Sequence, residues 1–334
     1  MSAELVRFSS LGEYLSARIK GQEDAVSRLT AAVQRGEMGV SRDRRPKGSF
    51  LLLGPTGTGK TEISLALVRF LAGVDDDDVV NRRFARFDMA EYQESSGVGR
   101  LIGRHRDEQG LLGDAIDRVA SNGGGVILFD EIEKADGDLT TLFLSAMDSA
   151  RVTMANGQTK NLRDFYLIFT SNLGSGDAAQ MQVSSQERVR KHIMSVAQSY
   201  FRPELFARFD EKIVFNKLDY ETQVQIAQGL LIKEIKLLCD QKNVQISVGG
   251  SVLNHLIKRG FDRILGARPM RGAVEREIGN AWSRFLLERL RAGESVNAQE
   301  RLVLGVFGHE LELKKMEPLA PSGLKEQAVL MKHS

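Results

Sequence analysis

The spacing of apolar residues changes character twice along the 334-residue chain. Over residues 5–35 apolar side chains recur at three- and four-residue steps with a break near Gly21, which predicts two amphipathic helices. From Ser49 short apolar runs alternate with helical patterns, and after Phe215 long helical patterns take over. The sequence therefore predicts an α/β domain followed by a smaller, mostly helical domain.

The α/β region is expected to cover residues 48–215, and residues 1–47 are expected to pack on it as helices and a basic connection. Apolar runs predict four strands, at 50–53, 84–88, 125–130 and 166–171. The segments between them predict helices at 60–72, about 108–121 and about 138–149. Strands separated by helices form a mostly parallel sheet that is covered on both faces.

The second domain is expected to cover residues 216–314. Its apolar spacing predicts three long helices, at 220–241, 249–260 and 269–292. Two strand-like pieces, at 244–248 and 301–313, predict a small sheet. Residues 315–334 hold two prolines and scattered charges with little periodicity, which predicts a flexible tail.

Composition places the chain among soluble globular proteins, with 42% hydrophobic and 27% charged residues. A net charge of +2 does not by itself indicate a nucleic-acid or membrane partner. The single cysteine, Cys239, excludes an intrachain disulfide framework and is read as a buried apolar residue. The chain has neither a secretory leader pattern nor an apolar run near the ~20 residues of a membrane-spanning helix. We therefore expect a cytoplasmic protein without membrane contact.

The loop between the first predicted strand and helix carries the strongest chemical signal. It consists of Gly54, Pro55, Thr56, Gly57, Thr58, Gly59, Lys60 and Thr61. This fits the pattern G-x-x-x-x-G-K-[ST] in its strand-to-helix context, where backbone N–H groups and a helix N-terminus surround phosphates. Lys60 would reach the β- and γ-phosphates, and the Thr61 hydroxyl would bind Mg²⁺. The loop predicts that the protein binds a nucleoside triphosphate with Mg²⁺.

Two later strands end in polar residues that belong to the same chemistry. The run 126–129 ends in Asp130, which would hold Mg²⁺ directly or through water, and Glu131, which would polarise the attacking water. Asn172 ends the strand at 166–171 and would orient that water or contact the γ-phosphate. Arg208 and Arg268 are candidates for stabilising the transferred phosphoryl group, although spacing alone also fits ordinary surface arginines.

The order of these motifs resembles that of an AAA+ ATPase, and closely the second ATPase module of the Clp unfoldase and disaggregase family. The stretches that carry the resemblance lie at 21–26, 48–61, 87–92, 100–103, 127–135, 170–175, 201–204 and 266–269. The resemblance implies ATP as the nucleotide, a sensor-1 role for Asn172, a trans-acting arginine finger at Arg208 and a sensor-2 role for Arg268. It also places Ile19 and Lys20 near the adenine, and implies a lid domain and a ring, usually of six copies.

The chain also departs from that family. Its segment 103–110 is shorter than the family's pore loop and lacks the aromatic residue that grips substrate, so threading of a polypeptide is in doubt. We expect no first ATPase module and no amino-terminal substrate domain, and Gly174–Ser185 shows no loop for docking a barrel peptidase. We expect a single-module ATPase, in a hexameric ring or spiral, that remodels an unidentified protein partner.

Two alternatives stay open. An ATP-controlled platform on nucleic acid would use the basic connection at 42–47 and the basic residues Arg104, His105 and Arg106. A slowly hydrolysing scaffold would signal by assembly.

Overall fold

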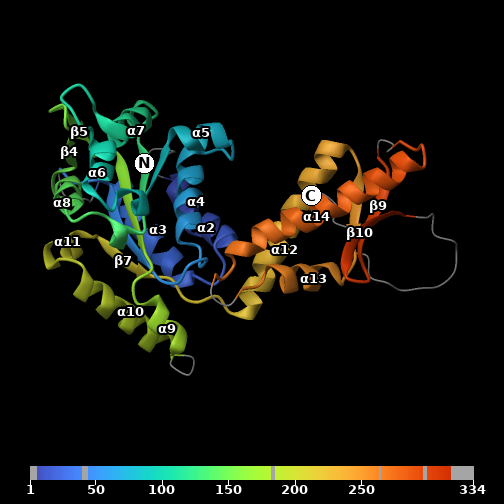
Figure 1. Cartoon of the computed structure of the whole chain (residues 1–334). Helices are drawn as coiled ribbons and strands as arrows, with labels where there is room; N and C mark the ends of the chain where they lie inside the picture. Colours follow the sequence, from blue (N-terminus) through green and yellow to red (C-terminus); the bar gives the residue numbers. More distant parts are fainter. Residues whose placement is uncertain (1–5, 40–43, 182–184, 263–264, 296–298, 317–334) are drawn as a thin grey trace. The chain divides into compact units, whose positions relative to one another are not determined.

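The computed structural model describes residues 6–39, 44–181, 185–262, 265–295 and 299–316. The chain divides into two compact units, Met1–Lys217 and Leu218–Ser334, which we call unit 1 and unit 2 (Figure 1). Among the described residues, unit 1 holds two apolar clusters and unit 2 holds one.

Unit 1 is built on a five-stranded parallel sheet with strand order β2-β3-β6-β1-β7. The strands are β1 (Gly48–Leu53), β2 (Phe84–Asp88), β3 (Gly125–Asp130), β6 (Phe165–Ser171) and β7 (Glu211–Val214). Strands β1, β3 and β6 are buried along their whole length, as expected for the centre of a sheet with both faces covered. Because β6 lies between β1 and β3, the residues that follow these three strands meet at one edge.

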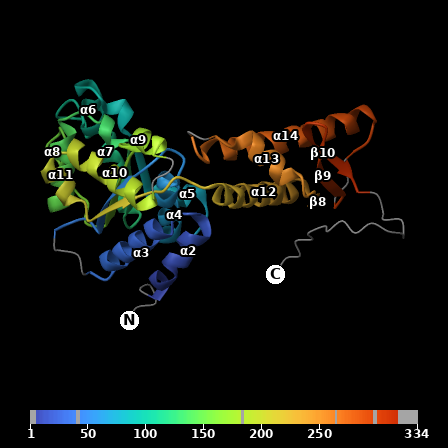
Figure 2. The same cartoon turned by 90° about the horizontal axis from the view of Figure 1, so that it is seen from below.

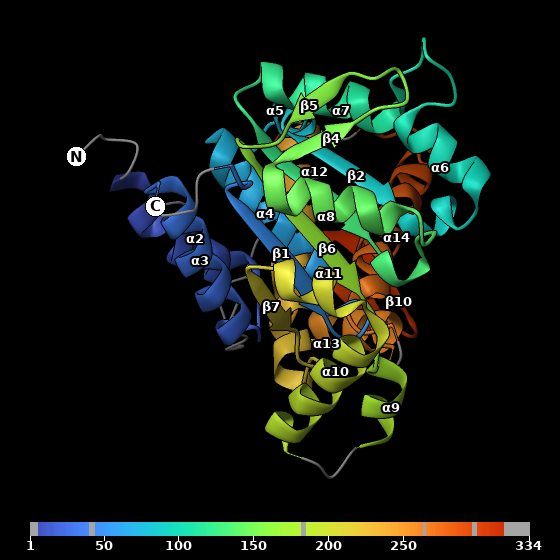
Figure 3. The same cartoon turned by 90° about the vertical axis from the view of Figure 1, so that its left-hand side faces the viewer.

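Alternate residues of β1 point into two separate cores. Phe50 and Leu52 pack with α2 (Leu11–Arg18), α3 (Glu23–Glu37) and α4 (Lys60–Ala72) on one face. Leu51 and Leu53 face the other core. That second face is covered by α7 (Gly110–Ser121), α8 (Leu139–Ser149), α10 (Gln186–Tyr200) and α11 (Pro203–Arg208). Figure 2 separates the two helix layers, and Figure 3 faces the side on which α8 and α11 lie over the sheet.

Several elements of unit 1 had no signal in the sequence analysis. They are β7, the hairpin of β4 (Arg151–Thr153) and β5 (Thr159–Asn161), and the helices α5 (Asp77–Arg82), α6 (Ser95–Ile102), α9 (Ser175–Gln180), α10 and α11. Most are short. Strand β7 has only two fully buried residues, so its apolar run is too brief to stand out. The Asp76 carboxylate accepts from the Asp78 N–H and so begins α5.

Unit 2 packs three helices on a three-stranded sheet. The helices are α12 (Tyr220–Lys242), α13 (Val252–Gly260) and α14 (Arg268–Arg291), and the strands are β8 (Gln245–Val248), β9 (Arg301–Phe307) and β10 (Glu310–Lys315). The sheet order is β10-β9-β8, and β10 contacts α14 (Figure 2). The predicted single strand at 301–313 is in fact a hairpin, because the chain turns at Gly308 with a φ of 64°.

The predicted fold class is confirmed: a parallel sheet flanked by helices precedes a mostly helical domain with a small sheet. In the basic connection, Arg45 pairs with Asp148 and Asp210, and Lys47 pairs with Glu37. The predicted flexible tail lies outside the described residues from position 317 onward. Among the helices that the structure describes, none has the length and apolar character needed to cross a bilayer.

Candidate functional site

The phosphate loop joins β1 to α4 and depends on glycine at three positions. Gly54, Gly57 and Gly59 have φ values of 132°, 74° and 106°, which L side chains rarely adopt. A Cβ on Gly54 would lie 2.5 Å from the backbone oxygen of Phe215. Inside the loop, the Thr58 hydroxyl donates to the Pro55 carbonyl at 2.8 Å. The loop is therefore curled tightly in front of the N-terminus of α4, as phosphate binding requires.

Lys60 lies folded back across the phosphate loop. Its ammonium donates to the carbonyl oxygens of Gly54 and Pro55, at 2.5 and 2.8 Å, and to Asn172 Oδ1 at 2.8 Å. Burial lowers the pKa of this ammonium to about 8, while nearby carboxylates, Asp130 foremost, act in the opposite direction. Lys60 therefore carries its charge at neutral pH and holds it where an incoming phosphate would need it.

The lowered pKa of Lys60 predicts how nucleotide affinity depends on pH. Only the protonated amine attracts phosphate, so affinity for ADP should stay level up to about pH 8 and then fall, by up to about tenfold per pH unit. Titration with a fluorescent ADP at fixed excess Mg²⁺ measures this. Lys60→Arg cannot lose its charge in this range, so its weaker binding should show no such decline. A level profile for the wild-type protein would contradict the role of Lys60.

Asp130 and Glu131 end β3 in different environments. Asp130 is 8% exposed, and its Oδ1 accepts a hydrogen bond from the Thr170 hydroxyl of β6. Its Oδ2 accepts from Arg86 Nη2 at 2.6 Å. The Glu131 backbone is in the left-handed region, with φ 58° and ψ 52°, which is unusual for a side chain of this size. Asp130 is thus held at the sheet edge by two donors, while Glu131 follows it in a left-handed turn.

Asn172 joins Glu131 to Lys60. Its Nδ2 donates to Glu131 Oε1 at 3.2 Å, while its Oδ1 accepts from Lys60. Its backbone N–H donates to Glu133 Oε1 at 3.0 Å, which fixes the position of the amide at the end of β6. Lys134 Nζ lies 2.5 Å from Glu131 Oε2, and the Glu131 carboxylate raises the pKa of Lys134. Glu131 thus has a partner on each oxygen but remains 27% exposed, so water can reach it.

The oxygen ligands at this edge fit Mg²⁺. Thr61, in the first turn of α4, offers a hydroxyl, and the buried Asp130 offers a carboxylate. Magnesium takes oxygen ligands and is usually held by one or two carboxylates together with substrate phosphates. Within the described part of the chain, no group of three or more His, Cys, Asp or Glu side chains forms a dedicated metal site. These residues would therefore hold the ion together with a bound nucleotide.

The remaining predicted residues lie in three places. Ile19 is buried beside the loop, since a Cβ on Gly59 would lie 3.8 Å from its Cγ2, whereas Lys20 donates to the Ser16 carbonyl. Arg208 ends α11, and its Nη1 lies 2.9 Å from Asp148 Oδ1. Arg268 begins α14 in unit 2. The structure therefore brings the phosphate loop, Asp130, Glu131, Asn172 and Ile19 together, and places Arg208 and Arg268 on other elements.

Sequence reasoning missed the residues that position this group. Gln22 is 1% exposed, and its Nε2 donates to the carbonyls of Thr58 and Asn216, at 3.2 and 2.8 Å. No local pattern reveals a contact between positions so distant in the chain. Arg86, which binds Asp130, lies on β2, two residues before β2 ends, and its role becomes visible only once β2 is known to pair with β3. Lys134 had a local signal, because it lies three residues after Glu131 in the sequence.

The segment 103–110 forms a compact, exposed loop. The Arg104 N–H donates to Glu108 Oε2, and the Glu108 N–H donates to the His105 carbonyl, both at 3.1 Å. Its two ends touch, because a Cβ on Gly110 would lie 2.3 Å from the backbone nitrogen of Gly103. Arg104, His105 and Arg106 are exposed. The loop therefore presents charged side chains on a closed base.

Substitution at the base of this loop should lower stability. Gly110→Ala would place a Cβ against backbone atoms of residues 101–103 at a φ of 68°, at a cost of about 2 kcal/mol or more. Thermal unfolding measures the loss. The matched control is Gly137→Ala, where a Cβ meets nothing within 4 Å and φ is not positive. Equal melting temperatures for the two variants would disprove the close approach.

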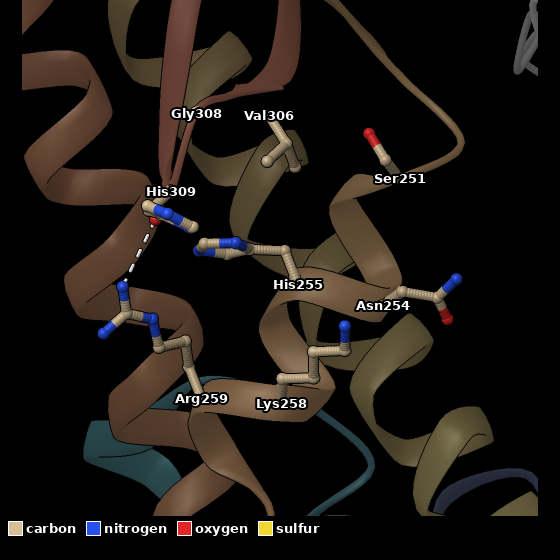
Figure 4. Close-up of a pocket in the computed structure, with 8 residues that line it drawn as sticks. All are labelled: Ser251, Asn254, His255, Lys258, Arg259, Val306, Gly308 and His309. Atoms are coloured by element: carbon tan, nitrogen blue, oxygen red, sulfur yellow. Dashed lines mark hydrogen bonds between the residues drawn. The ribbon is translucent and has the colours of Figure 1, made fainter.

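A pocket of about 390 Å³ lies in unit 2 (Figure 4). Residues of α13 and of the hairpin β9–β10 line it, and the Arg259 guanidinium donates to the His309 carbonyl at 3.2 Å. His255 Nε2 lies 3.5 Å from Glu277 Oε2. The lining carries the basic side chains of His255, Lys258, Arg259 and His309, and it lacks the glycine-rich loop and the carboxylates of the site in unit 1.

Comparisons with known proteins match two families to two successive parts of the chain. Residues 45–212 match the family described as AAA domain (Cdc48 subfamily), and residues 218–298 match the C-terminal, D2-small domain of ClpB protein.

Curated relatives align along most of the chain. Chaperone protein ClpB 2 of Thermosynechococcus vestitus is 37% identical over 325 residues, covering 95% of this chain and 35% of that protein. Chaperone protein ClpB 1 of Synechococcus elongatus is 36% identical over 314 residues, covering 91% of this chain and 35% of that protein. Chaperone protein ClpB of Dichelobacter nodosus is 35% identical over 292 residues, covering 86% of this chain and 33% of that protein. The chain spans about a third of the length of these relatives.

Proposed function

The chain belongs to the AAA family of ATPases and carries a ClpB-type D2-small domain, and on this premise we propose that it binds and hydrolyses ATP at the phosphate loop. The observation that carries the proposal is the contact chain Lys60–Asn172–Glu131. It links a phosphate-binding cation to the carboxylate that activates water, across three adjacent strands. A site built only to bind nucleotide has no need of the second carboxylate.

In the proposed reaction each residue has one task. Lys60 exchanges its loop carbonyls for phosphate oxygens, and Asn172 orients Glu131. The Glu131 carboxylate accepts a proton as water attacks the γ-phosphorus, and the bond to the β-phosphate oxygen breaks to give ADP and phosphate. Mg²⁺, held by Thr61 and Asp130, would supply charge neutralisation at the phosphates. Ile19 and Lys20 are proposed to lie near the adenine, and Arg268 keeps its proposed sensor-2 role.

We further propose that copies of the chain assemble, as a ring or spiral, and that Arg208 serves the site of a neighbouring copy. The relatives' names identify them as chaperone proteins, which supports a protein as the partner that this ATPase remodels. The exposed charged loop 103–110 supports remodelling without an apolar grip on a threaded chain. The barrel-peptidase prediction concerns Gly174–Ser185, of which residues 182–184 lie outside the described part. The cytoplasm stays the proposed compartment.

The proposal is tested by what stimulates ATP hydrolysis. The purified protein is assayed alone, with an unfolded protein, and with single-stranded DNA or RNA at several salt concentrations. Stimulation by the unfolded protein alone is the expected result. Stimulation by nucleic acid that weakens steeply with salt would favour the nucleic-acid platform, because neutralised phosphates release counterions.

The structure removes part of the support for nucleic-acid binding. Arg45 and Lys47 of the basic connection already pair with carboxylates of unit 1, whereas Arg44 and the loop residues Arg104, His105 and Arg106 are exposed. Assembly with ATP and negligible turnover would instead favour the scaffold.

A further inference from the structure

Arg86 binds Oδ2 of Asp130, the carboxylate oxygen that Thr170 does not bind. Strands β2 and β3 pair so that Arg86 lies opposite Leu128, and Asp130 is the next residue along on the same face. A diagonal neighbour of this kind is within reach of a long side chain. The Arg86 Nη2 accordingly lies 2.6 Å from Asp130 Oδ2.

Both oxygens of Asp130 therefore have donors before any metal arrives. Oδ1 accepts from Thr170 and Oδ2 accepts from Arg86. The Asp130 side chain is 11% exposed, and a carboxylate at that depth needs a compensating charge. Arg86 supplies it, yet its own side chain is 46% exposed. The guanidinium can therefore move into solvent with little change in its own solvation free energy.

We propose that Arg86 is the exchangeable counter-ion of Asp130, which it neutralises in the metal-free protein and releases when Mg²⁺ enters with nucleotide. The inference rests on the proposed role of Asp130 as the magnesium-binding carboxylate. Two cations beside one carboxylate repel each other, whether the ion binds directly or through water. Arg86 is thus a positioning residue, which stabilises the empty site and weakens its affinity for Mg²⁺.

The test measures the affinity for a fluorescent ADP as a function of free Mg²⁺, in the wild-type protein and in Arg86→Ala and Arg86→Gln. Without its competitor, the half-saturating Mg²⁺ concentration should fall by about tenfold, the effect of one charge-assisted hydrogen bond. The melting temperature without Mg²⁺ or nucleotide should fall as well, because Asp130 loses its charge partner. The rise in melting temperature on adding Mg²⁺ and ADP should be larger than in the wild-type protein.

The control is Arg100→Ala, which removes an arginine of equal exposure that pairs with the exposed Glu91. It should leave the Mg²⁺ dependence unchanged. A half-saturating Mg²⁺ concentration in both Arg86 variants equal to or above the wild-type value would overturn the inference. If the wild-type protein binds no nucleotide at any Mg²⁺ concentration, the proposed function fails first, so the two failures are distinguishable.

Discussion

Glu131→Gln is expected to bind ATP with nearly the affinity of the wild-type protein and to hydrolyse it at least ~100-fold more slowly. The amide keeps the shape of the side chain and can still contact Asn172, whose Nδ2 lies 3.2 Å from Glu131 Oε1. It cannot accept a proton from water at neutral pH, so chemistry is lost while binding is kept. Steady-state phosphate release and equilibrium binding of a fluorescent ATP analogue measure the two effects separately.

The matched control for Glu131→Gln is Glu187→Gln. Glu187 is an exposed carboxylate of α10 that pairs with Lys191, and its loss should leave turnover unchanged. If Glu131→Gln turns over at a rate near that of the wild-type protein, Glu131 is not the base. The same variant in ATP also offers a way to retain the unidentified partner, which can then be identified after purification.

Arg208→Ala is expected to leave ATP binding intact and to abolish hydrolysis that depends on assembly. The Arg208 side chain is 42% exposed and pairs with Asp148, which also lies 3.4 Å from Arg45 Nη2. Its removal therefore leaves Asp148 with a cation, and unit 1 should fold normally. Loss of a guanidinium that contacts the phosphates from a neighbouring copy should cost about 10³-fold or more in rate.

Mixing two inactive variants tests whether Arg208 acts on a neighbour. Arg208→Ala carries an intact Glu131, and Glu131→Gln carries an intact Arg208. An interface between one copy of each variant can therefore contain one complete site. Turnover should therefore reappear on mixing. An arginine that serves its own copy predicts no recovery. Arg202→Ala, at the other end of α11, is the control and should retain turnover and its dependence on protein concentration.

The sequence predicts those parts of the molecule whose pattern is local. The strand that precedes the phosphate loop, the loop itself and the run that ends in Asp130 each lie within a few consecutive residues, and the central strands appear where they were predicted. The contact between Lys60 and Asn172 was not predicted, and it arises because neighbouring parallel strands end at one edge of the sheet. What the sequence analysis missed depends on contacts between distant positions. Arg86 reads as an ordinary strand arginine until β2 is known to pair with β3.

The second class of missed features consists of short elements held by their surroundings. Strand β7 has four residues and pairs with β1, and just before β7 the Asp210 carboxylate accepts hydrogen bonds from the N–H and hydroxyl of Ser49. The hairpin β9–β10 was read as one strand, since the alternation of apolar residues continues on both sides of Gly308. Periodicity reports which residues face a core, whereas the place where the chain reverses depends on one backbone angle.

The buried amide of Gln22 has a mechanical consequence. It binds the Thr58 carbonyl of the phosphate loop and exchanges two hydrogen bonds with the backbone of Asn216, which comes two residues before unit 2 begins. A buried amide that loses a partner is costly, so Gln22 and its partners should move together. A displacement of Thr58 by arriving or departing phosphates would be passed through this one side chain to the backbone of Asn216, near the end of unit 1. Binding of phosphates to the phosphate loop would in this way pull on the backbone at Asn216.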